Sequence, residues 1–185
     1  MNEENNLHSH LRDIGFALPN ASSLIACQAS NLTEITDNLQ PIYDKTCLEK
    51  PELGQVERLV GLFSYYHHGL LQQFDQQQGS LKNVLDVFEQ QLPLGDKPRF
   101  SAPIITQFWL ATHLWLFVQG RMNLDYSLAN DHAIEVSTRL SNVTKLDMDA
   151  LRCELNKSYY QGIALYQRQN NLKPLWKKWF EKWLN

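Results

Sequence analysis

The chain lacks the motifs that mark most catalytic and cofactor-binding sites. It contains no phosphate-binding loop of the Gly-x-x-x-x-Gly-Lys-Ser/Thr type, no nucleophile elbow and no His-Glu-x-x-His zinc motif. A Glu-x-x-His pair, which supplies ligands in helical di-iron proteins, is also missing. We therefore expect no catalytic residue, no cofactor and no bound metal, and we favour a non-enzymatic function.

Cysteine is scarce, and the chain has no segment typical of a signal peptide or a membrane span. Cys27, Cys47 and Cys153 lie far apart without metal-ligand spacing, which is typical of free thiols in a reducing compartment. The chain starts with an acidic, polar stretch, and the most apolar segment, residues 104–118, is too short and too polar to cross a bilayer. These absences predict a cytoplasmic protein in which residues 104–118 form a buried core helix.

Strand-like alternation is nearly absent, whereas apolar residues recur at helical spacing along almost the whole chain. With 185 residues, 43% of them hydrophobic and 20% charged, the chain is suited to one folded domain rather than to disorder. We predict an all-α protein, a compact bundle of about seven to nine helices that forms a single domain over residues 1–185. Residues 93–103, a segment rich in proline and glycine, are a candidate subdomain boundary.

A helix with a long apolar stripe is predicted from about residue 53 to residue 78. Its apolar positions alternate spacings of three and four, as in helices that pack at shallow angles: Leu53, Val56, Val60, Phe63, His67, Leu70 and Phe74. Gly79 and Ser80 are expected to end this helix and to begin a shorter one, and Pro41 is expected to end or kink the preceding helix. Gly61 and Gly69, on the less apolar side, are expected to let a neighbouring helix approach closely.

Tryptophan is concentrated at the C-terminus. In residues 172–185, six large apolar side chains share one face of a predicted helix, and three of the segment's four lysines fill the other face together with Glu181. So much apolar surface is expected to dock, and we predict that the preceding helix of the same chain covers it. The apolar residues are Leu175, Trp176, Trp179, Phe180, Trp183 and Leu184.

The first candidate site is an exposed helical surface that binds another protein. Low charge and aromatic content are typical of interface cores, and both features occur together around residues 65–73. The predicted partner-binding residues are Tyr65, Tyr66, His68, Gln72 and Gln73. On this hypothesis the protein is a regulator, an adaptor or an immunity-type inhibitor, and its partner is another protein or a second copy of the chain in a homodimer.

The second candidate is an internal site in a ligand-binding or enzymatic bundle. His67 lies on the apolar stripe and His113 lies near Trp109 on the core helix, so the three side chains could line a small pocket. The competing interpretation, which we favour, is that each histidine is buried and individually hydrogen-bonded. His132 and Glu135, spaced one helical turn apart, are predicted to form a surface pair.

A third candidate is contact with a membrane surface or a nucleic acid through the basic face of the C-terminal segment. Lys173, Lys177, Lys178 and Lys182 would supply the positive charge beside the tryptophans. The whole chain, however, carries a formal net charge of −3, which is a weak basis for binding polyanions. We therefore rank nucleic acid and membrane partners below a protein partner.

Overall fold

The computed structural model describes residues 6–17, 24–25, 27–91 and 102–170, apart from the side chains of residues 78–91, 102 and 103. Over these residues every regular element is a helix, which confirms the predicted all-α class. The described helices are α1 (Leu7–Asp13), α2 (Ala29–Glu49), α3 (Gln55–Gln91), α4 (Ala102–Arg121), α5 (Tyr126–Thr144) and α6 (Met148–Gln169). They number six rather than seven to nine, and the tryptophan-rich segment lies outside the described residues.

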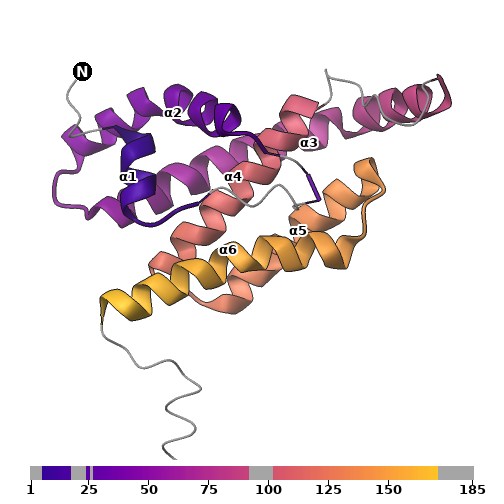
Figure 1. Cartoon of the computed structure of the whole chain (residues 1–185). Coiled ribbons are helices and arrows are strands. Elements are labelled where there is room, and N and C mark those ends of the chain that lie inside the picture. Colours follow the sequence, from indigo (N-terminus) through magenta and orange to yellow (C-terminus); the bar gives the residue numbers. More distant parts are fainter. Residues whose placement is uncertain (1–5, 18–23, 26, 92–101, 171–185) are drawn as a thin grey trace, which may run out of the picture.

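The helix count is lower partly because α3 is continuous where the sequence suggested two helices. α3 runs for 37 residues through Gly79 and Ser80, so the prediction that these residues end a helix is wrong. A glycine inside a helix costs only about 1 kcal/mol relative to alanine, which does not end the helix by itself. The continuous helix extends beyond the rest of the bundle (Figure 1).

α2 likewise continues through Pro41, so of the two effects expected of this proline, an end or a kink, the end of the helix is wrong. Proline has no N–H to donate to the carbonyl of Asp37, four residues earlier. Asp37 and Pro41 are both exposed, however, so water can hydrogen-bond the carbonyl that the proline leaves unpaired. The buried side of α2, which includes Ile35 and Tyr43, packs in the core and stabilises the helix despite the proline.

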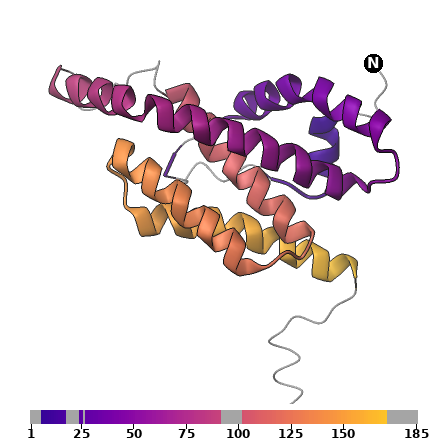
Figure 2. The ribbon, with the colours of Figure 1, turned by 180° about the vertical axis from the view of Figure 1, so that it is seen from behind.

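α4 is the central helix of the bundle. Residues 108–120 are all buried, which confirms the buried core helix predicted at residues 104–118. A helix that is apolar around its circumference needs neighbours on several sides, and α3, α5 and α6 supply them. Figures 1 and 2 show α4 passing between one layer of α1, α2 and α3 and another of α5 and α6. None of the described helices, α4 included, combines the length and the apolarity that a membrane span requires.

Two hydrophobic clusters lie on either side of α4. Leu114 and Phe117 belong to the cluster shared with α1, α2 and the first part of α3, whereas Phe108 and Trp109 belong to the cluster shared with α5 and α6. Each large side chain that becomes fully buried contributes roughly 1.5–3 kcal/mol to folding. Because α4 contributes to both clusters, it holds the two layers together. The candidate subdomain boundary at residues 93–103 lies largely outside the described residues.

α4 and α6 touch backbone to backbone at Gly120 and Gly162. A Cβ on Gly120 would overlap the carbonyl oxygen of Tyr159, and a Cβ on Gly162 would overlap the carbonyl oxygen of Phe117. Only hydrogen fits at these two positions, so both require glycine. This crossing fixes α6 against the central helix.

Candidate functional site

The outward side of α3 forms an uncharged surface. Seven exposed, uncharged residues make up this surface, which is named the Tyr65 face: Gly61, Tyr65, His68, Gly69, Gln72, Gln73 and Gln76. The opposite side of α3 carries the buried stripe that packs on α4, so the helix has one apolar side and one neutral, solvated side. Figure 2 shows α3 on the near side of the molecule, with α4 crossing behind it.

Charge is absent from a long stretch of this helix. No Asp, Glu, Lys or Arg occurs between Arg58 and Asp75, a length of about four helical turns. Tyr65, in the middle of the stretch, is 72% exposed. A solvated helix face ordinarily carries charged residues, whereas interface cores are depleted of charge and enriched in aromatic residues. The composition of the Tyr65 face is therefore closer to that of an interface than to that of a solvated surface.

The structure places four of the five predicted partner-binding residues on this face: Tyr65, His68, Gln72 and Gln73. Gln72 donates from Nε2 to Nε2 of His68 at 3.2 Å, which links two of them. Tyr66 does not belong to the face, because its ring packs against both hydrophobic clusters. Burial, with a smaller effect from Glu34, raises the pKa of Tyr66 to about 12. Adjacent helical residues point about 100° apart, which separates Tyr66 from Tyr65.

Gly61 and Gly69 lie one turn before and one turn after Tyr65. They are expected to let a neighbouring helix approach closely, but no described helix does so, because a Cβ at either position would meet no atom of the described residues within 4 Å. Nothing in the described residues requires glycine there, although each glycine costs about 1 kcal/mol of helix stability relative to alanine. At Gly120 and Gly162, in contrast, a neighbouring backbone fills the space. The Tyr65 face thus has two unfilled positions for close approach beside an exposed tyrosine.

His67 is buried between α3 and α4 and is hydrogen-bonded. Its Nε2 lies 3.1 Å from Oγ1 of Thr112, whose hydroxyl donates to the carbonyl of Phe108 at 2.7 Å. Because that hydroxyl has a single hydrogen, Nε2 of His67 is the donor to Thr112. The imidazole also contacts the rings of Phe108 and Trp115. Burial, with a smaller effect from His132, lowers the pKa of His67 to about 3, so the side chain is neutral at pH 7.

His113 faces a different neighbour. Its Nδ1 lies 2.6 Å from Oγ of Ser158 on α6, and its ring meets Trp109 edge to face at a centroid distance of 4.6 Å. Burial lowers the pKa of His113 to about 3. Since His113 follows Thr112 on α4, the two histidines contact different sides of that helix and do not converge. The prediction that each histidine has its own hydrogen-bond partner is confirmed.

The interior next to His113 contains polar atoms that lack partners. Nε2 of His113 and Nε1 of Trp109 are buried, and neither has a hydrogen-bond partner among the described residues. Within the same part of the chain, no group of three His, Cys, Asp or Glu side chains is arranged to hold a metal ion. The three residues of the predicted internal site therefore do not form one group: the rings of His113 and Trp109 are in contact, and His67 is hydrogen-bonded separately to Thr112.

His132 and Glu135 were predicted to form a surface pair, but the structure places the side chain of His132 only partly in solvent. Its ring lies 4.0 Å from that of Trp115, and its Nδ1 lies 3.9 Å from a carboxylate oxygen of Glu135. Burial lowers the pKa of His132, although Glu135 acts in the opposite direction. Glu135 also pairs with Arg139, whose guanidinium forms a two-point ion pair with Asp75 at 2.7 and 3.1 Å. This network links α5 to α3 beside one end of the Tyr65 face.

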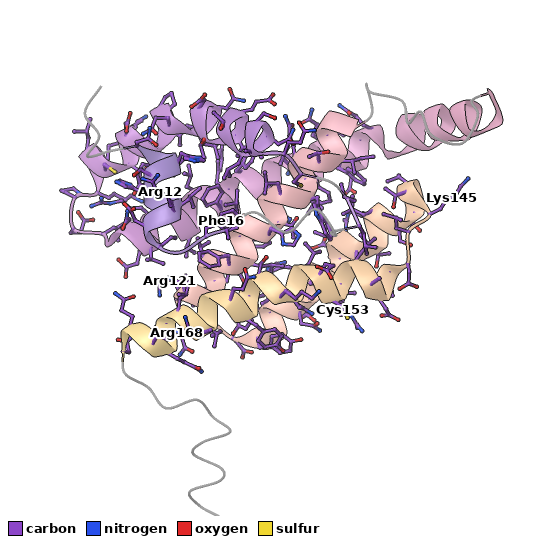
Figure 3. The ribbon with its side chains drawn as sticks, viewed as in Figure 1. Arg12, Phe16, Arg121, Lys145, Cys153 and Arg168 are labelled. Carbon is purple, nitrogen blue, oxygen red and sulfur yellow. The ribbon has the colours of Figure 1, made fainter. Side chains whose placement is uncertain are left out.

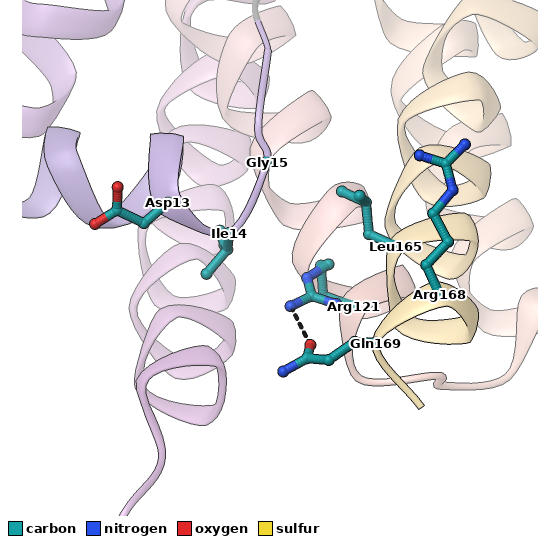
Figure 4. Close-up of a pocket in the computed structure, with 7 residues that line it drawn as sticks. All are labelled: Asp13, Ile14, Gly15, Arg121, Leu165, Arg168 and Gln169. Atoms are coloured by element: carbon teal, nitrogen blue, oxygen red, sulfur yellow. Dashed lines mark hydrogen bonds between the residues drawn. The ribbon is translucent and has the colours of Figure 1, made fainter. Parts of the chain in front are cut away.

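A surface cavity of about 360 Å³, largely open to solvent, lies where the C-terminal ends of α1, α4 and α6 meet (Figure 4). Its lining residues are Asp13, Ile14, Gly15, Arg121, Leu165, Arg168 and Gln169. Arg121 donates from Nη2 to Oε1 of Gln169 at 2.8 Å. Gly15 has a φ of +86°, a conformation that favours glycine, and it brings the end of α1 against Leu165. No sequence signal identified this site, because three helix ends far apart in the chain form it.

Comparisons with protein-family models, with curated proteins and with solved structures give no match to this chain. The function is therefore inferred from the geometry of the described residues.

Proposed function

We propose that the protein binds another protein through the Tyr65 face of α3, as a regulator, an adaptor or an immunity-type inhibitor. One observation supports this most strongly. An exposed helix face without charge for about four turns carries a 72% exposed tyrosine between two unfilled glycine positions. Covering neutral groups costs less free energy than covering charged ones, so this face loses little when a partner removes it from water.

A helix of the partner is the shape that fits this face best. Gly61 and Gly69 let a second backbone come close, and Tyr65 supplies a large amphipathic anchor between them. Tyrosine is among the residue types that carry most of the binding energy at interfaces. Gln72 and Gln76, two and three turns further on, offer amide groups for hydrogen bonds. A second copy of the chain satisfies the same requirements, so the proposal includes a homodimer.

The direct test is a double substitution, Tyr65→Ala with Gln72→Glu, which removes the anchor and places a charge on the face. We expect partner capture from a host extract, or self-association measured by sedimentation velocity, to weaken about tenfold or more. Both residues are exposed, so helicity measured by circular dichroism stays unchanged.

The matched control is Leu48→Ala, at an apolar residue of α2 that is 83% exposed. This substitution removes exposed apolar surface away from the Tyr65 face, and we expect it to leave binding unchanged. Binding that survives the double substitution on α3 places the interface elsewhere and rejects the proposal.

A second candidate function is the binding of a small polar ligand inside the bundle. It is favoured by two buried nitrogens that have no partner among the described residues, Nε2 of His113 and Nε1 of Trp109. Nε1 of Trp109 donates, whereas Nε2 of His113 donates or accepts according to which ring nitrogen carries the proton. A buried polar group without a partner costs about 1–3 kcal/mol, and a ligand that hydrogen-bonded both nitrogens would relieve this cost. We rank this function second because the cavity described above lies at the C-terminal end of α4 and not at these residues.

Three further expectations remain proposals. A cytoplasmic location is supported by the free thiols of Cys27, Cys47 and Cys153. Residues 172–185 are proposed as a further helix that docks on its own chain, and they lie outside the described residues. Contact with a membrane or a nucleic acid through the lysines of that segment remains the third-ranked function.

A further inference from the structure

The cavity at the ends of α1, α4 and α6 combines positive charge with apolar walls. Arg121 and Arg168 line it together with one acidic residue, Asp13, and with the apolar side chains of Ile14 and Leu165. Figure 3 shows both arginines at the same end of the molecule. We propose that this cavity binds a small organic carboxylate of single negative charge, with the Arg121 guanidinium as its counter-ion. The site is separate from the Tyr65 face and does not depend on the function proposed for it.

Arg121 is a partly buried cation that has no counter-ion among the described residues. Its guanidinium donates to the neutral amide of Gln169, and no ion pair of Arg121 is found among the described residues. Nε of Arg121 is buried and lacks a hydrogen-bond partner in the same part of the chain. Burial lowers the pKa of Arg121, because loss of solvation disfavours the charged form. A charge removed from water is costly unless an opposite charge compensates it, and an anion in the cavity would do so.

The position of the Arg121 side chain is not explained by hydrogen bonds to the carbonyl groups at the end of α4. Basic residues in the last turn of a helix often hydrogen-bond the terminal carbonyls. In α4 these carbonyls already accept backbone N–H groups of the following loop, with Met122 donating to Val118 at 3.1 Å and Asn123 to Gly120 at 2.9 Å. The guanidinium of Arg121 instead points across the space between the end of α1 and α6 (Figure 4).

The walls of the cavity define the class of ligand. A guanidinium presents parallel N–H groups that match the planar geometry of a carboxylate. Asp13 at the same cavity opposes ligands that carry two negative charges, such as phosphate near neutral pH. Ile14 and Leu165 provide apolar contacts for a short hydrocarbon group. Arg168 is exposed and adds attraction at longer range.

The test is a titration of the full-length, ¹⁵N-labelled protein with hexanoate, followed by NMR. We expect saturable shifts of the amide signals of Gly15, Leu165 and Gln169, with a Kd of about 1 mM, as is usual for so small a ligand. Hexanamide, which has the same size and no charge, is expected to give no saturable shift, and inorganic phosphate is expected to bind more weakly than hexanoate.

Two substitutions locate the site. Arg121→Gln removes the charge and is expected to weaken hexanoate binding about tenfold or more. Arg121→Lys keeps the charge without the planar fork and is expected to weaken binding less, which covers the case in which the glutamine variant does not fold. Arg152→Gln is the control, because Arg152 on the same helix α6 is already paired with Asp149 at 3.0 Å.

Four results would overturn the proposal. The first is the absence of saturable shifts with hexanoate. The second is equal binding of hexanoate and hexanamide, and the third is equal binding by the wild-type protein and a folded Arg121 variant. The fourth is tighter binding of phosphate than of hexanoate, which would exclude a ligand of single negative charge.

Discussion

His67 and His113 are neutral in the folded protein at neutral pH, since burial lowers the pKa of each to about 3. In an unfolded chain, histidine has a pKa of about 6.5. Between these two values the unfolded protein binds more protons than the folded protein does, so the free energy of unfolding decreases as the pH falls. Each histidine changes this free energy by about 1.4 kcal/mol per pH unit inside that window.

We predict a loss of stability that begins below about pH 6.5 and continues towards about pH 3. Urea unfolding, followed by circular dichroism at a series of pH values, measures it. In His67→Phe, whose ring can still contact Phe108 and Trp115, one of the two histidine contributions is removed and the slope with pH becomes smaller. A free energy of unfolding that stays constant between about pH 7 and about pH 4 would show that the buried histidines are not neutral.

Two pairs of helical glycines differ in what surrounds them. Gly120 and Gly162 lie in backbone contact at the crossing of α4 and α6, where a side chain does not fit. Gly61 and Gly69 lie on the outward side of α3, where a Cβ would meet no atom of the described residues within 4 Å. At the first pair, the missing side chain lets the backbone of a second helix come into contact. At the second pair, the missing side chain leaves similar room, which no described helix occupies.

We predict that Gly120→Ala and Gly162→Ala each lower the free energy of unfolding by about 3 kcal/mol, because the new Cβ overlaps a carbonyl oxygen of the facing helix. Chemical denaturation of the two variants measures the effect. A Gly120→Ala variant as stable as the wild-type protein would mean that α4 and α6 are further apart than the structure shows.

For the molecule as a whole, the sequence predicted the helical class and the buried central helix but not the helix boundaries. The apolar spacing around α4 is a local property, so it is visible in the sequence. Whether Pro41 or Gly79 ends a helix depends instead on packing and solvent around the backbone, which the sequence does not specify. The helix ends predicted at Pro41 and at Gly79 were therefore wrong, while the all-α class was right.

The candidate sites were predictable to different degrees. Tyr65, His68, Gln72 and Gln73 were found from composition and helical spacing, because an exposed face of one helix is a local pattern. The inward position of Tyr66 depends on the phase of the helix relative to its neighbours, which composition does not give. The cavity at Arg121 joins three separate helices, so it appears only when the tertiary structure is known.

The charge distribution of the folded molecule supports the proposal that the Tyr65 face binds a partner. The chain has a formal net charge of −3 at neutral pH, with 37 charged residues (17 basic and 20 acidic). None of these charged residues lies at positions 59–74 of α3. Several side chains in this range are exposed to solvent, where charged residues are ordinarily found. An uncharged outward surface on a charged protein is suited to a partner that covers it.

The most direct test of this account is the double substitution Gly61→Ala with Gly69→Ala. Alanine is the better helix former and its Cβ meets no atom of the described structure, so we predict a melting temperature above that of the wild-type protein. The added methyl groups fill the positions where a partner backbone would approach, so we predict that partner binding or self-association weakens about tenfold or more. A double variant that is more stable and binds as tightly as the wild-type protein would contradict the proposed role of the Tyr65 face.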